Sequence, residues 1–155
     1  MSLDIPVFDL KPLKKYFNYF LIAVVSIAAI CIVSVTVFHS QYFLSVYYLQ
    51  GNNNWYFLGA ALLLTYVSGT LQKKSMKAVQ QAEDTELKFS LYTKYYSRKL
   101  FWGAFSFFIT GLLWMMTGGK FLFYFFVFQF VLSLVFHPNK AIITRELNIG
   151  EIEFI

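Results

Sequence analysis

Three polar side chains, Gln129, Ser133 and His137, recur at intervals of four in an otherwise apolar stretch. Residues four apart share one face of a helix, so the three predict a polar line along a single helix. Within a membrane, such a line commonly hydrogen-bonds neighbouring helices and contributes about 0.6–2 kcal/mol per bond. The alternative is that it forms the wall of a lipid-binding groove, a ligand site or a pore. The sequence leaves both interpretations open.

Other residues that could carry chemistry are few and scattered. The lone Cys31 excludes an internal disulfide, a CxxC pair and a cysteine zinc site. His39 and His137 are predicted to lie at opposite faces of a membrane, so they cannot share a metal or a haem. The chain has no P-loop, GxSxG or HExxH motif. We therefore expect no catalytic residues, no metal site and no cofactor, and a protein that is not an enzyme.

The chain is dominated by apolar runs, with 58% of residues hydrophobic and only 14% charged. A bilayer core of about 30 Å is crossed by about 20 apolar residues of helix, and lipid provides no partner for an open strand edge. We predict an all-α integral membrane protein in which residues 1–155 form one domain with four transmembrane helices in two hairpins. The predicted spans are about 16–38, 55–71, 100–117 and 121–136.

The polar segment 72–99 contains neither Gly nor Pro and is rich in helix-forming residues. It predicts a helical hairpin that extends spans two and three into the cytoplasm, with Asp84 as the N-cap of its second arm. Gly118 and Gly119 predict a tight turn that brings spans three and four into contact. Pro138 ends span four and leaves a tail, 137–155, with a short helix around 141–147.

The short apolar segments outside the spans are expected to lie at the membrane surface or on the cytoplasmic face. Val7, Phe8 and Leu10 are placed in the interface, and so is the aromatic segment 42–49. The end of the tail, 152–155, is expected to fold back on the cytoplasmic face, to insert into a partner or to fray.

Basic residues set the predicted orientation. Twelve of the 13 Lys and Arg residues lie in the two terminal segments or in segment 72–99, which the predicted spans place on one side of the membrane. Only Lys120 lies in a loop on the opposite side. The positive-inside rule makes that side cytoplasmic. We predict a bacterial inner-membrane protein with both termini in the cytoplasm.

The basic hairpin is the main candidate for an interaction surface. The net charge of +5 of the whole chain does not indicate nucleic-acid binding, because the basic residues lie beside apolar runs, where they bind anionic headgroups. Its candidate residues are predicted to bind anionic lipid headgroups or to dock a partner helix; simple solvation of a self-packed hairpin is the alternative. They are Lys73, Lys74, Lys77, Leu87, Leu91, Tyr95, Arg98 and Lys99.

The predicted spans contain no Asp, Glu, Lys or Arg, although ion-coupled transport normally needs an ionisable residue in the bilayer. The leading hypothesis is therefore a non-catalytic accessory or scaffold subunit, which acts through helix packing and the basic hairpin on other membrane subunits or on copies of itself. The alternative is a small oligomeric channel or transporter whose pore is lined by the polar residues of span four.

Overall fold

The computed structural model describes residues 6–37, 54–149 and 152–155. The sequence predictions for His39 and for segment 42–49 lie outside these residues. The described elements are five helices and a pair of short strands. In chain order they are β1 (Val7–Phe8), α1 (Lys11–Val37), α3 (Asn54–Gln81), α4 (Thr85–Thr117), α5 (Lys120–Val135), α6 (Lys140–Leu147) and β2 (Glu153–Phe154).

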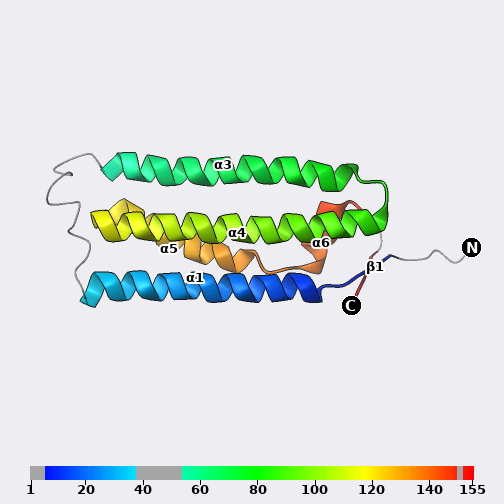
Figure 1. The fold of residues 1–155 in the computed structure, drawn as a ribbon, viewed down its shortest axis with the longest axis horizontal. Helices are drawn as coiled ribbons and strands as arrows, with labels where there is room; N and C mark the ends of the chain where they lie inside the picture. The colour runs from blue at the N-terminus through cyan, green and yellow to red at the C-terminus, as the bar shows by residue number, and fades with distance from the viewer. Residues whose placement is uncertain (1–5, 38–53, 150–151) are drawn as a thin grey trace, which may run out of the picture.

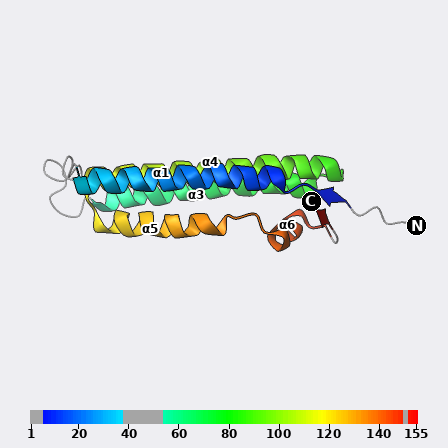
Figure 2. The same ribbon diagram turned by 90° about the horizontal axis from the view of Figure 1, so that it is seen from below.

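Helix α4 lies at the centre of an elongated bundle, with α1 along one side and α3 along the other (Figure 1). Helix α5 packs against α4 from a different face, as the view in Figure 2 shows. The chain runs in the same direction in α1 and α4 and in the opposite direction in α3 and α5. Among the described helices α1 packs mainly against α4, so the predicted pairing of the first two apolar runs as a hairpin is not confirmed.

The helical fold class is confirmed, and two helices are long and apolar enough to cross a membrane: α1, with 27 residues, and α4, with 33. Helices α5 and α6 add a third candidate if the pair, bent by 85°, is counted as one span. Helix α5 alone has 16 residues, about 24 Å at 1.5 Å per residue. Large apolar side chains such as Ile22 (64% exposed) and Ile30 (62%) point away from the protein, as lipid-facing residues do.

The continuous helical hairpin between the second and third apolar runs is confirmed. Helix α3 continues to Gln81 and α4 begins at Thr85, so both apolar runs extend into the polar segment without a break. The Asp84 side chain accepts hydrogen bonds from the backbone N–H groups of Glu86 (3.2 Å) and Leu87 (3.3 Å), which is the predicted N-cap. At the far end, Gly118 adopts a left-handed conformation with φ 63° and closes the turn into α5.

The two ends of the described chain meet. Strand β1 pairs in parallel with β2, and Val7 lies opposite Glu153. Phe8 and Leu10 are each only 4% exposed, and the Phe8 ring packs on Phe89 of α4 at 4.7 Å. The interface placement of these two residues was therefore wrong, because the protein itself covers them. The end of the tail folds back onto the start of the described chain; its predicted place on the cytoplasmic face stays a prediction.

The charged residues gather at one end of the bundle. The start of α1, the end of α3, the start of α4 and the whole of α6 all lie at this end (Figure 1). They carry twelve of the thirteen basic residues, and Lys120 stands alone at the opposite end. We call the charged end the basic end.

Candidate functional site

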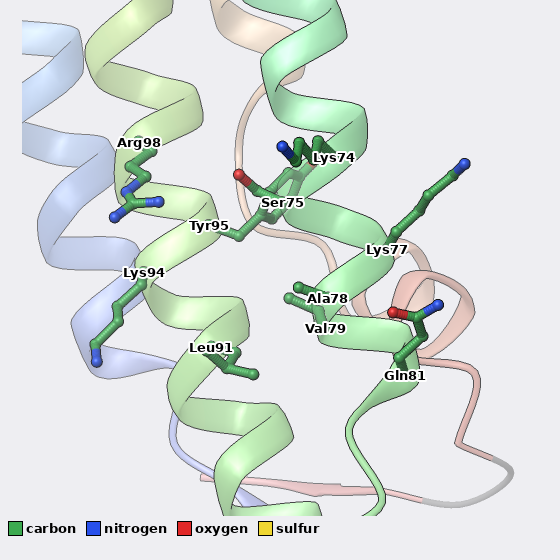
Figure 3. Close-up of a pocket in the computed structure, with 10 residues that line it drawn as sticks. All are labelled: Lys74, Ser75, Lys77, Ala78, Val79, Gln81, Leu91, Lys94, Tyr95 and Arg98. Carbon is green, nitrogen blue, oxygen red and sulfur yellow. The ribbon is translucent and has the colours of Figure 1, made fainter.

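A groove runs between α3 and α4 at the basic end, with a volume of about 760 Å³. Figure 3 shows its lining: Lys74, Ser75, Lys77, Ala78, Val79 and Gln81 from α3, and Leu91, Lys94, Tyr95 and Arg98 from α4. A second hollow of about 260 Å³ shares four of these residues and adds Leu71, Gln72 and Trp102. The two together form what we call the basic groove, which reaches from the polar arms to the beginning of the apolar run.

Four cations, Lys74, Lys77, Lys94 and Arg98, line the basic groove, and no Asp or Glu of the described residues does so. Among the described residues, none of the four forms an ion pair; the ion pair found there joins Lys99 to Glu146. Unpaired like charges that share a groove repel one another, and an anion bound between them would relieve that repulsion. The groove therefore has the electrostatics of an anion site.

The predicted hairpin residues divide between the groove and other surfaces. Lys74, Lys77, Leu91, Tyr95 and Arg98 come together in the groove, where the Tyr95 ring, 8% exposed, forms part of the wall. Leu87 is 51% exposed and lies outside, as does Lys73. Lys94 was not among the predicted residues, although its position four residues before Arg98 on a helix places the two on one face.

Lys99 faces a different side of α4, where it helps to attach α6. Its Nζ lies 3.9 Å from Oε1 of Glu146, and the Tyr92 hydroxyl donates to Oε2 of the same carboxylate at 2.6 Å. Tyr92 lies in the polar arm, outside the predicted span, and burial raises the pKa of its phenol, with a further increase from the hydrogen bond to Glu146. The phenol therefore stays protonated at neutral pH and keeps donating to the carboxylate.

A smaller cavity of about 190 Å³ lies deeper in the bundle, where α1, α3, α4 and α5 meet. We call it the Gln129 cavity. Its apolar walls include the rings of Phe20, Phe107 and Phe136. The polar residues that line it are Thr65, Ser68, Gln72, Lys99, Ser106, Gln129 and Ser133.

A chain of hydrogen bonds crosses this cavity from α5 to α3. The Gln129 Nε2 donates to Oγ of Ser106 at 3.1 Å, the hydroxyls of Ser106 and Thr65 lie 3.1 Å apart, and Thr65 donates to the carbonyl of Ala61 at 2.9 Å. The other amide atom, Gln129 Oε1, is buried and has no hydrogen-bond partner in the described ranges. Sequence reasoning found Gln129 but not its partners, which lie on helices far away in the chain.

Ser133 and His137, the other members of the predicted polar line, have different surroundings. Ser133 is 3% exposed, lines the Gln129 cavity and donates to the carbonyl of Phe130 at 2.6 Å. His137 comes after the end of α5, and its ring meets the Phe17 ring of α1 edge-on at 5.1 Å. The structure thus brings two of the three polar residues to the cavity, because the helix ends before the third.

The chain matches no family model, no curated protein and no solved structure. Within the described ranges, no three His, Cys, Asp or Glu residues are grouped so that they could hold a metal ion. The basic groove and the Gln129 cavity are therefore the two sites from which a function is inferred.

Proposed function

We propose that this chain is a non-catalytic subunit of the bacterial inner membrane, with four spans and both termini in the cytoplasm. It acts as an accessory or scaffold protein through its helix faces and the arms of α3 and α4. In this proposal the basic end faces the cytoplasm, and anionic lipid headgroups in the basic groove hold the two arms at the membrane surface.

The observation that carries the proposal is the set of four cations in the groove, which have neither an ion-pair partner nor an acidic neighbour in the lining within the part of the chain that the structure describes. Trp102 and Leu71 line the groove, at the end that the proposed topology places nearer the membrane, and Trp is a residue typical of the headgroup region. A basic residue near an anionic membrane surface contributes about 1 kcal/mol of binding free energy. A phosphate headgroup with its acyl chains beside Trp102 fits this combination of charge and apolar surface.

The test is lipid binding by the purified protein, measured by native mass spectrometry with phosphatidylglycerol and with phosphatidylcholine. We expect phosphatidylglycerol to bind more tightly. Replacing both Lys74 and Arg98 by Gln should weaken that binding by about 2 kcal/mol, roughly 30-fold, because two headgroup contacts are lost. The matched control is the pair Lys73→Gln and Lys88→Gln, which removes the same charge outside the groove. Equal losses in both pairs would show that the groove is not the lipid site.

The subunit role is tested by purification in mild detergent, followed by identification of the chains that accompany the protein. A membrane protein that stays with the Lys73/Lys88 control but is lost from the Lys74/Arg98 variant would be a partner of the arms. If the protein instead purifies alone as a homo-oligomer that conducts ions in liposomes, the subunit role is excluded.

A channel or transporter remains the second candidate, because the Gln129 cavity contains a polar path among four helices. In that case the polar residues of α5 would line the path that the solute follows. Replacing Gln129 by Leu should then reduce solute flux into liposomes that contain the protein. Unchanged flux would remove Gln129 from the pore wall.

A further inference from the structure

We propose that the Gln129 cavity binds a small uncharged amphiphile from the bilayer and accepts a hydrogen bond from its hydroxyl or N–H group at Gln129 Oε1. The ligand class is an alcohol or amide with an apolar chain. The site is separate from the cations of the basic groove, but access to it from lipid rests on the membrane topology of the proposed function.

The hydrogen-bond chain fixes which way the Gln129 amide faces. The Thr65 hydroxyl uses its hydrogen on the Ala61 carbonyl, so the Ser106 hydroxyl has to donate to Thr65. Because the Ser106 hydroxyl has used its hydrogen, its Oγ can only accept the hydrogen bond from Gln129 of α5. The group of Gln129 that faces Ser106 must therefore be the NH2 group. A flipped amide would place its oxygen against an oxygen that has no hydrogen left to donate. The free atom is therefore the acceptor, Oε1.

A buried acceptor without a partner is a destabilising feature that native proteins seldom leave uncompensated. Here the unpaired atom belongs to a residue that lines a cavity with space for a ligand. Less than 1 Å² of Oε1 itself is accessible, so binding requires the Gln129 amide to shift toward the cavity. The cavity, at about 190 Å³, is smaller than the roughly 300–1,000 Å³ typical of drug-sized ligand sites. It therefore suits a small molecule or the polar end of a single chain.

The exposed residues of the cavity show where a ligand enters. Thr65 of α3 and Leu132 of α5 line it and are also exposed, so it opens between these two helices. Both residues belong to apolar runs, and in the proposed topology this opening faces lipid. Lys99, the one ionised side chain among the described lining residues, already pairs with Glu146, which favours an uncharged ligand.

The donor requirement can be tested with two isomers, n-octanol and heptyl methyl ether, which have the same atoms but differ in hydrogen-bond donation. The purified protein in lipid nanodiscs is photolabelled with a diazirine-bearing long-chain alcohol, and labelled peptides are mapped by mass spectrometry. We expect labels on α3 and α5 around the opening. Octanol should compete for them about five- to tenfold more effectively than the ether, because only octanol donates a hydrogen bond.

Two variants and a control test whether the preference for octanol over the ether arises in the Gln129 cavity. Gln129→Leu should abolish the difference between octanol and the ether. Gly69→Leu should reduce labelling, since Gly69 lines the cavity and a Cβ there meets no atom within 4 Å. Gly59→Leu is its control, because Gly59 has the same open surroundings but lies outside the cavity.

Equal competition by the two isomers in the unmodified protein would overturn the proposal, and so would a preference for octanol that survives Gln129→Leu. The Lys74→Gln/Arg98→Gln variant separates this site from the lipid groove. Its labelling should be unchanged even if the proposed lipid binding fails.

Discussion

At the scale of single residues, the Tyr92 phenol connects α4 to α6 through the Glu146 carboxylate at 2.6 Å. Replacing Tyr92 by Phe removes this charge-assisted hydrogen bond and should lower the opening free energy of α6 by about 1.5–3 kcal/mol. Hydrogen exchange of the α6 amides measures this change. The control is Tyr95→Phe, which also shortens a buried tyrosine but removes no hydrogen bond found among the described residues. Comparable exchange in the two variants would contradict the assigned role.

The N-cap at Asp84 is a second contribution from one side chain. Asp84→Ala leaves two backbone N–H groups at the start of α4 without their acceptor and should cost about 1 kcal/mol of stability. Unfolding by titration with a denaturing detergent measures the loss. Glu83→Ala next to it, an exposed position that does not cap the helix, should change stability much less.

Local chemistry explains which individual residues could be predicted from the sequence. The cap at Asp84 depends on neighbours two and three positions away, and the turn at Gly118 depends on one backbone angle. The Gln129 site depends on Ser106 and Thr65, which are 23 and 64 positions away in the chain. Spacing along one helix could identify Gln129 as polar and inward-facing, but it contains no information about those partners.

At the scale of elements, α4 packs tightly against side chains of α1 and α5 at Gly111. A Cβ at this position would lie 2.8 Å from the Cys31 sulfur and 2.8 Å from Cε2 of Phe126. Gly111→Ala should therefore destabilise the bundle by about 1–3 kcal/mol, because overpacked side chains have to shift. Detergent unfolding measures the effect. Gly59→Ala, where the added Cβ meets nothing, is the control and should be neutral or slightly stabilising.

A double substitution tests this explanation. Cys31→Ala removes one of the two atoms that the new Cβ would meet, so the pair Gly111→Ala and Cys31→Ala should recover part of the stability lost by Gly111→Ala alone. If the two losses simply add, the close contact between α1 and α4 is not the cause.

The positions of the helices could be predicted from the sequence, but which helices pack against each other could not. Apolar runs and caps act within one segment, so the helices end close to their predicted bounds; α1 is an exception and begins at Lys11, before the predicted span. The choice of neighbours depends on how small residues such as Gly103 and Gly111 admit large side chains from other helices. For this reason α1 packs against α4, although the next apolar run in the chain is α3.

At the scale of the whole molecule, the grouping of charges predicts the topology. In a Cys31→Ala background, single cysteines at Glu83 and at Lys120 should react with a membrane-impermeant thiol reagent from opposite sides, because they lie at opposite ends of the bundle. Only the cysteine at Lys120 should be labelled in intact cells, since the basic end is predicted to be cytoplasmic. Labelling of the cysteine at Glu83 in intact cells would reverse the proposed orientation.

The pairing of β1 with β2 also determines an order of events in time. Val7 and Glu153 are 146 positions apart in the sequence, and all of the described helices lie between them. Strand β1 emerges from the ribosome first but has no partner until synthesis has passed α6. Phe8 and Leu10 therefore lack part of their final cover until the last residues of the described chain have been synthesised. Strands β1 and β2 can therefore pair only after the helices between them have been synthesised and have packed together.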